Sequence, residues 1–314
     1  MNVLSFTMGS ATGGVPIGIA RAFANEPGWN VRSLVSTINY IDYPIDLEWT
    51  RQNIVRYWTE ADVVHLHHGF LSADKLVVGR YAGRGLHHKP YVVEFHGTGF
   101  RQDPKPYLDE AKSRNALVLV STLDLYLLGD TEWLPQPQDV EKLSRMRQPR
   151  DDGKVRICHA PTNRQIKSTD LLIEAVERLQ AEGYPVELDL IEHRPWAECL
   201  ERKAKADIYF DQIILGYGCN ALEAWAMGIP VIAGAQDETL DEMERRFGHL
   251  PFLHATEDTI YDALKELVES PELRAQYGKI GQDYVRRYHD YPVVVEQLKR
   301  IYRKALGQTQ EEAA

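Results

Sequence analysis

Short apolar runs alternate with amphipathic segments along most of the chain. The runs have the length of strands and lie at 3–6, 31–36, 62–67, 90–95 and 116–122, then at 154–160, 185–191, 207–211 and 229–234. Residues 169–183 instead repeat apolar side chains at helical spacing, on a face formed by Leu171, Leu172, Ala175, Val176 and Leu179. Strands that alternate with helices predict parallel sheets with helices on both faces.

The helix over 169–183 carries signals at both ends. Ser168 or Thr169 is expected to cap its amino end, and Gly183 followed by Pro185 is expected to end it. The loop before it then lies between a strand end and a helix start, which is where parallel sheets place their binding sites.

The series of strands and helices runs twice, with a polar break between the two runs. Segment 147–155 contains Pro149 and Gly153 and precedes a fresh strand. We therefore expect an α/β fold with two facing, Rossmann-like, doubly wound domains at 1–150 and 151–290, and an active site in the cleft between them. A long amphipathic helix is expected at 291–306 and a disordered tail at 307–314.

Charge and cysteine content narrow the class of protein. The 314 residues include 36 Lys+Arg and 46 Asp+Glu, and the resulting net charge of −10 argues against a duplex-DNA binder. Cys158, Cys199 and Cys219 are far apart in the sequence, so neither a disulfide framework nor a cysteine zinc site is expected. Without a recognisable signal peptide or a long apolar run, the expected location is the cytoplasm.

Two loops that follow strands suit phosphate. Gly13 and Gly14 stand just before Pro16, where backbone N–H groups at a helix start can approach an anion. In HAPTNRQIKSTDLL (159–172), Arg164 and Lys167 add two cations to a helix start, which favours a diphosphate. Ordinary turns with solvated charges are the alternative for both loops. The absence of G-x-G-x-x-G disfavours a nicotinamide oxidoreductase.

A third loop leads into a helix with one isolated carboxylate. In GYGCNALEAWAMGIPVIAG (216–234), Gly216, Tyr217 and Gly218 precede the helix, and Glu223 lies among apolar neighbours. A buried carboxylate without partners is costly or takes up a proton, and the two hydroxyls of a ribose would satisfy it. A glutamate on the solvent side of the helix is the alternative, and the residues alone do not decide.

Histidines stand at the ends of two further strands. His96 in EFHGTGFR follows the run at 90–95 and is placed for a role in the cleft, with a structural histidine as the alternative. Another strand end carries Asp62, His65, His67 and His68. Because no carboxylate or cysteine spacing accompanies these histidines, we expect packing or acceptor contacts there, and no metal.

The stretch G-Y-G-x4-E-A-x-A-x-G-x-P-V resembles the C-terminal signature of retaining GT-B glycosyltransferases of the family 4 type. In that family the second glutamate of an E-x7-E pair binds the ribose of a nucleotide sugar, and Glu223 matches it. Lys167 and Arg164 match the lysine and arginine of its diphosphate loop. Gly13 and Gly14 look like its N-terminal glycine loop, and VVEFHGTGFR is similar to the segment whose histidine faces the transferred sugar or acceptor, here His96.

The resemblance covers residues 1–305 and implies the GT-B fold, with the final helix crossing back to the N-terminal domain. It fails at Leu215, eight residues before Glu223, where the first glutamate of the pair is expected. A leucine cannot accept hydrogen bonds from sugar hydroxyls, so Asp211 or Gln212 is expected to replace that glutamate. This fits a bacterial subset with a D-Q...G-Y-G...E pattern and leaves the identity of the sugar open.

The resemblance thus implies a transferase that moves a sugar from a UDP- or GDP-sugar to a glycan or lipid-linked acceptor, with retention and without a metal cofactor. His96, Glu223 and Lys167 are the expected catalytic residues. The expected donor contacts are Gly13, Gly14, Arg164, Lys167, Asp211, Gly216, Tyr217, Gly218 and Glu223. Cations and helix N–H groups would stabilise the leaving diphosphate in place of a metal.

Three other functions stay open. The chain could be a non-catalytic nucleotide-sugar-binding module, a GT-B sugar-nucleotide epimerase, or a glycosyltransferase acting on modified DNA bases, the last disfavoured by the acidic composition. Arg80, Arg84 and Lys89 could bring the protein to the inner face of an anionic membrane, although a solvated helix end is the simpler explanation.

Overall fold

The computed structural model describes residues 1–10, 12–68 and 89–307, and the chain divides into two compact units. Unit 1 consists of Met1–Asn39, Tyr43–Pro137 and Tyr291–Ala314, and unit 2 of Tyr40–Asp42 and Gln138–Asp290. The boundary falls before Gln138 and not at 150, because helix α7 (Val140–Ser144) packs against α10 (Cys219–Ala226) of unit 2. All but the first residue of the expected tail lies outside the described residues.

Unit 1 is built on a six-stranded sheet with the order β2-β1-β3-β4-β5-β6, in which all neighbouring strands are parallel. Its strands are β1 (Asn2–Ser10), β2 (Asn30–Thr37), β3 (Val63–His67), β4 (Tyr91–Phe95), β5 (Leu117–Val120) and β6 (Glu132–Trp133). The five strands expected in this half are present. β6 was not expected, since two residues show no periodicity.

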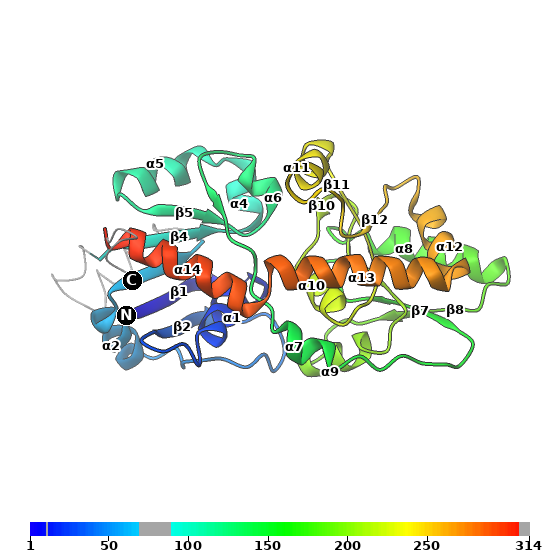
Figure 1. Cartoon of the computed structure of the whole chain (residues 1–314), viewed down its shortest axis with the longest axis horizontal. Coiled ribbons are helices and arrows are strands. Elements are labelled where there is room, and N and C mark those ends of the chain that lie inside the picture. The colour runs from blue at the N-terminus through cyan, green and yellow to red at the C-terminus, as the bar shows by residue number, and fades with distance from the viewer. Residues whose placement is uncertain (11, 69–88, 308–314) are drawn as a thin grey trace. The chain divides into compact units, whose positions relative to one another are not determined.

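The two faces of the unit 1 sheet differ in chemistry. One face is an apolar core built around Leu4, Phe6, Leu66, Val93 and Phe95. The alternate positions of β1, β3 and β4 carry polar side chains on the other face, which α14 (Tyr291–Ala305) helps to cover beside α1 (Val15–Ala22) (Figure 1). The described part of this unit also contains the helices η1 (Thr12–Gly14), α2 (Arg51–Glu60), α4 (Gly97–Gln102), α5 (Lys105–Ser113) and α6 (Leu123–Tyr126).

Unit 2 contains a second sheet with the order β10-β11-β9-β7-β8, and β12 pairs with β11. Its strands are β7 (Val155–His159), β8 (Val186–Leu190), β9 (Ile208–Phe210), β10 (Leu215–Gly216), β11 (Val231–Ala235) and β12 (Leu253–His254). All pairs are parallel except β10 with β11. The four strands expected in this half are present as the consecutive neighbours β11, β9, β7 and β8, with β8 at one edge.

Helix α8 (Thr169–Ala181) has the expected apolar face but not the expected cap. Leu172, Ala175, Val176 and Leu179 are buried in the unit 2 core. Ser168 occupies the cap position with a left-handed φ of 52° and makes no side-chain cap, and the hydroxyl of Thr169 bonds elsewhere. The prediction of a side-chain cap is therefore wrong. Among the described residues, no helix is long and apolar enough to cross a bilayer.

The long helix α13 (Pro271–Tyr288) packs against α10 through two glycines. The other helices of this unit are α9 (Trp196–Lys203), α11 (Asp237–Phe247) and α12 (Ile260–Glu269). A Cβ atom on Gly281 would lie 2.0 Å from Cδ1 of the buried Trp225, and one on Gly278 would lie 2.3 Å from the carbonyl oxygen of Gly228. The close approach of the two helices therefore depends on the absence of side chains there.

We expect Gly281→Ala to destabilise unit 2 by about 2 kcal/mol, because overpacking costs roughly 1–3 kcal/mol and exceeds alanine's advantage in helix propensity of about 1 kcal/mol. Urea unfolding at constant m-value measures this difference. Gln276→Ala on the exposed side of the same helix is the control and should stay within about 0.5 kcal/mol of the wild type. Equal stability of Gly281→Ala and the control would contradict the packing described here.

Candidate functional site

The carboxyl ends of β7 and β9 bring three polar groups together around Asp211. Asp211 follows β9 directly and is 1% exposed. Its Oδ1 accepts a hydrogen bond from Nζ of Lys167 at 2.6 Å, and its Oδ2 accepts one from the backbone N–H of Gly218, also at 2.6 Å. One carboxylate thus joins the loop after β7, the end of β9 and the start of α10.

A tight turn in the loop after β7 positions Lys167. The side chain of Asn163 accepts a hydrogen bond from Ile166 N–H at 3.0 Å, and its carbonyl accepts one from Lys167 N–H at 3.0 Å. The left-handed conformation of Ser168 then turns the chain into α8. With 14% of its side chain exposed, the Lys167 ammonium group is held at the surface of this loop, as a phosphate contact requires.

The segment Gly216–Gly218 leads the chain into α10 beside these charges. Gly216 has a left-handed φ of 80°, which favours glycine. A Cβ atom on Gly218 would lie 3.4 Å from Nζ of Lys167 and 3.6 Å from Oδ2 of Asp211, so a side chain there would crowd both groups. The Tyr217 hydroxyl group forms hydrogen bonds with the Tyr284 hydroxyl group and with Nε2 of His289. Burial raises the pKa of Tyr217. Tyr217 therefore anchors the glycine segment within unit 2.

Glu223 is buried and paired, so it is not the solvent-facing glutamate of the alternative reading. It is 8% exposed, its Oε1 accepts a hydrogen bond from Nε1 of Trp196 at 3.0 Å, and its Oε2 forms an ion pair with Lys203. Lys203 is itself 0% exposed and donates to Oδ1 of Asn220 at 2.9 Å. The buried charge of Glu223 is thus balanced inside the protein, and a short α9–α10 network fixes its position.

Arg164 lies in the same loop as Lys167 but has a separate partner. Its Nε and Nη2 donate to the two carboxylate oxygens of Glu192 at 2.8 and 2.6 Å. This hydrogen-bonded pair raises the pKa of Arg164 and lowers that of Glu192. Because the fork of the guanidinium is occupied, a diphosphate would have to share Arg164 with Glu192 or displace that carboxylate.

Two residues that support this region, Lys203 and His159, were not identified from the sequence. Lys203 balances Glu223, yet nothing in CLERKAKAD marks one lysine as buried. His159 ends β7, where its Nδ1 donates to the Phe210 carbonyl at 2.9 Å and its Nε2 accepts from the Thr169 hydroxyl at 2.9 Å. This histidine joins the end of β9 to the start of α8 and so supports the whole constellation. Its place at a strand end was a signal that could have identified it.

The glycine pair expected to contact the donor lies in unit 1. Gly13 and Gly14 form the turn before α1 with φ values of 58° and 72°. A Cβ atom on Gly14 would lie 2.1 Å from the Tyr43 hydroxyl oxygen, so packing against Tyr43 is enough to require glycine at this position. The structure brings Lys167, Asp211, Gly218 and Glu223 into one region of unit 2, whereas Gly13 and Gly14 belong to the other unit.

His96 follows β4 as expected, but its imidazole ring points into unit 1. Only 1% of its side chain is exposed. Its Nδ1 lies 3.0 Å from Oγ of Ser121 and its Nε2 lies 3.0 Å from Nδ1 of His67. Both nitrogens are therefore engaged by side chains, and the arrangement resembles the structural alternative more than a group presented to a sugar.

The histidines of β3 are buried next to a carboxylate that the sequence interpretation did not connect with them. His65 and His67 are 0% and 3% exposed, and Glu94 from the neighbouring strand β4 is 0% exposed. Ligand atoms of these three residues lie within 4.8 Å of one another. The statement that no carboxylate accompanies the histidines is therefore wrong. Asp62 lies before β3 and accepts the N–H of Asn2 at 2.7 Å.

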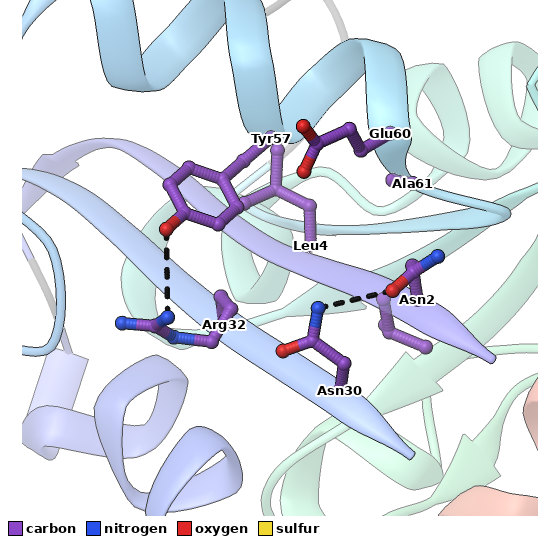
Figure 2. Close-up of a pocket in the computed structure, with 8 residues that line it drawn as sticks. Asn2, Leu4, Asn30, Arg32, Tyr57, Glu60 and Ala61 are labelled. Carbon is purple, nitrogen blue, oxygen red and sulfur yellow. Dashed lines mark hydrogen bonds between the residues drawn. The ribbon is translucent and has the colours of Figure 1, made fainter. Parts of the chain in front are cut away.

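A shallow surface pocket lies elsewhere, at the amino ends of β1 and β2. Figure 2 shows its lining by Asn2, Asn30, Arg32, Tyr57 and Glu60. Because binding sites of parallel sheets lie at the carboxyl ends, this pocket does not coincide with the constellation around Asp211. Arg80 and Arg84 of the basic stretch lie outside the described residues, and Lys89 donates to the carbonyl oxygen of Thr59 at 2.8 Å.

Comparison of the chain with solved structures identifies its fold. The chain is similar to an alpha-glucosyltransferase in complex with UDP and a 13-mer DNA containing a central A:G mismatch, with a TM-score of 0.66 and 12% identity over 96% of this chain and 99% of that chain. It is similar to sucrose-phosphate synthase from Thermosynechococcus elongatus, with a TM-score of 0.63 and 14% identity over 98% and 100% of the two chains. The chain has the GT-B fold.

Another GT-B match is the Anabaena protein Alr3699/HepE in complex with UDP and glucose, with a TM-score of 0.64 and 12% identity over 96% of this chain and 98% of that chain. No protein-family model matches the chain, and no curated protein matches its sequence. The GT-B likeness is therefore one of structure, spread over nearly the whole length of each partner.

The hydrogen bonds of His159 generate a prediction on pH. Burial lowers its pKa from 6.5 to about 4, so the folded unit holds the neutral ring. Its stabilising effect is complete above pH 6.5 and is lost as the pH falls towards 4, by up to about 3 kcal/mol. Between pH 7 and pH 4.5, urea unfolding of the wild type should therefore lose more stability than that of His159→Gln. Parallel pH profiles of the two proteins would exclude this role.

Proposed function

We propose that the protein is a glycosyltransferase that binds a nucleoside-diphosphate sugar through unit 2. The observation that carries the proposal is the cation at a helix start: Lys167 is held by the buried Asp211 beside the first N–H groups of α10. An ammonium group and the positive end of a helix dipole attract the same ligand, a phosphate. The resemblance of this loop to diphosphate-binding loops supports the same assignment.

The ribose of the donor is assigned to Glu223. Trp196 and Lys203 hold its two oxygens from the protein side. A carboxylate oxygen has more than one lone pair, so each can also accept a ribose hydroxyl. The distance along α10 suits this arrangement, with the diphosphate at the amino end near Gly218 and the nucleoside further along.

We further propose retention of configuration and transfer without a metal ion. The leaving diphosphate gains negative charge as the glycosidic bond breaks, and Lys167 and the α10 N–H groups stabilise it electrostatically. Neither step assigns proton transfer to His96, whose nitrogens are engaged inside unit 1. A glycan or lipid-linked molecule is the proposed acceptor, on the resemblance alone.

Lys167→Met should weaken UDP or GDP binding by about 10–100-fold, since a hydrogen bond to a charged group contributes roughly 1.5–3 kcal/mol. Calorimetric titration of each nucleotide in the presence of EDTA measures this and tests metal independence. Lys154→Met, which removes an exposed lysine of the same unit, is the control and should bind like the wild type. If neither nucleotide binds the wild type, the donor-site assignment is overturned.

The ribose contact is better tested by changing the ligand than by removing Glu223, because removal of Glu223 would leave the charge of Lys203 buried and unpaired. Wild-type protein should bind UDP more tightly than 2′,3′-dideoxy-UDP by about 10-fold or more. In a Glu223→Gln/Lys203→Met double variant, which removes both charges, this preference should shrink. An unchanged preference would move the ribose away from Glu223.

Turnover distinguishes the proposed reaction from its alternatives. A transferase should slowly release UDP or GDP from the matching nucleotide sugar, and proton NMR of the freed sugar before it equilibrates reports retention or inversion. An epimerase would instead convert one nucleotide sugar into another without releasing the diphosphate. Tight binding of a nucleotide sugar with neither product would indicate the non-catalytic module.

A further inference from the structure

A polar row crosses the middle of the unit 1 sheet on the face that α14 helps to cover. Register places Thr7 of β1, His67 of β3 and Glu94 of β4 side by side, and places Ser5 beside His65 one pleat earlier. All five residues are buried. Central strands of parallel sheets are normally apolar on both faces, so this row requires a specific reason.

Among the residues that the structure describes, none donates a hydrogen bond to the carboxylate of Glu94. Both of its oxygens are buried without a hydrogen-bond partner, and so is Nε2 of His65. Three ring nitrogens surround the carboxylate: Nε2 of His65 at 3.5 Å, Nδ1 of His67 at 3.4 Å and Nε2 of His96 at 3.8 Å. These distances are too long for hydrogen bonds to the carboxylate. His65 and His67 face its Oε2 atom, whereas His96 faces Oε1.

The outer nitrogen of each ring is held by a hydroxyl group. Nδ1 of His65 lies 3.0 Å from the Tyr302 hydroxyl, Nε2 of His67 lies 2.9 Å from Oγ of Ser5, and Nδ1 of His96 lies 3.0 Å from Oγ of Ser121. Histidines that bind metals are typically oriented in this way, with one nitrogen on the metal and the other fixed by a second group. The three inner nitrogens are thereby directed towards Glu94.

Two separations of the inner atoms are close to those around a tetrahedral ion. Ligand atoms about 2.0–2.1 Å from Zn²⁺ in tetrahedral geometry stand roughly 3.3–3.4 Å apart. Nδ1 of His67 and Nε2 of His65 lie 3.4 and 3.5 Å from Oε2 of Glu94. Nε2 of His96 lies 3.8 Å from Oε1 and 3.0 Å from Nδ1 of His67, so this ring needs the largest adjustment. Imidazole and carboxylate groups are ligands that Zn²⁺ prefers.

We propose that His65, His67 and Glu94 form a structural zinc site in the core of unit 1, with His96 as the fourth ligand once its ring has turned. Four protein ligands close the coordination sphere, so the ion has no open position for a substrate phosphate, and its role is to stabilise the unit. On binding, Zn²⁺ takes the place of the proton between His67 and His96, and this proton moves to the outer nitrogen of the same ring, where the neighbouring hydroxyl oxygen accepts a hydrogen bond from it. His96, whose ring lies at 12° to that of His67, must turn out of the common plane to coordinate.

The site would also attach the C-terminal segment. Tyr302 of α14 bonds the outer nitrogen of His65, so an ion on His65 indirectly fixes this helix on the sheet. The proposal is independent of the glycosyltransferase assignment, because the zinc ligands all belong to unit 1 and the donor residues to unit 2. Loss of zinc binding can therefore be measured in a protein that still binds the nucleotide, and loss of nucleotide binding in a protein that still binds zinc.

The decisive experiment measures zinc binding by the full chain without an affinity tag. Protein stripped with a strong chelator is titrated with Zn²⁺ by calorimetry. We expect one ion per chain and a higher unfolding temperature with zinc than without. Mg²⁺ should produce neither of these effects. Failure of the wild type to bind Zn²⁺ would show that the row is a metal-free polar network and overturn the proposal.

Glu94→Gln separates binding from folding. The Glu94 carboxylate accepts no hydrogen bond, so the variant should fold with at least wild-type stability in the absence of zinc. Its zinc affinity should fall by at least the roughly 10–100-fold that loss of an outer-shell partner already costs. His65→Gln is the second ligand variant, and Glu242→Gln, a buried glutamate of unit 2, is the control. Equal affinity in all four proteins would overturn the proposal.

Cobalt substitution locates the ion. Cys158, Cys199 and Cys219 of unit 2 form no disulfide with one another and are the competing ligands for a soft metal. The Co²⁺ complex of the wild type should show visible bands of a tetrahedral nitrogen and oxygen site and no thiolate charge-transfer band. A thiolate band, or Co²⁺ bands that persist in Glu94→Gln, would place the ion elsewhere and contradict the assignment.

Discussion

The buried carboxylate of Asp211 organises the candidate site. With 1% exposure it cannot be solvated by water, so it needs fixed donors, and it takes them from Lys167 and from the backbone of Gly218. Satisfying one charge therefore sets the position of a loop cation and of a helix start together. The Glu223–Lys203 pair has the same effect further along α10. Its two opposite charges are buried and hold α9 against α10. Buried charge pairs thus fix the positions of the residues in the candidate site.

Local pattern and strand-end logic predicted the parts of this arrangement that depend on short stretches of chain. The alternation of strands and helices follows from which residues are apolar, and Lys167, Asp211 and Gly218 follow from their positions after strands. Lys203 could not be found in this way, because its pairing with Glu223 depends on how α9 packs against α10. The same limit applies to Glu94, which meets His67 only through the register of β3 and β4.

The sheet of unit 1 has one apolar face and one polar face, and both are buried. Its apolar face resembles any parallel-sheet core, whereas the opposite face holds imidazoles, hydroxyls and a carboxylate that are sealed from water. Such a face is stable only when every polar group has a partner, since each unsatisfied group costs free energy. The order of β1, β3 and β4 in the sheet therefore constrains which side chains these strands can carry, beyond the usual requirement for apolar residues.

The return of α14 to unit 1 has a consequence for the order in which the protein forms during translation. Unit 2 is complete once residue 290 has left the ribosome, but unit 1 needs Tyr291–Ala314 as well as its N-terminal segments. The first half of the chain to be synthesised is therefore the last to finish folding, contrary to the usual N-terminal-first sequence of domains. Until Tyr302 arrives, the polar face lacks the hydroxyl group that fixes the outer nitrogen of His65.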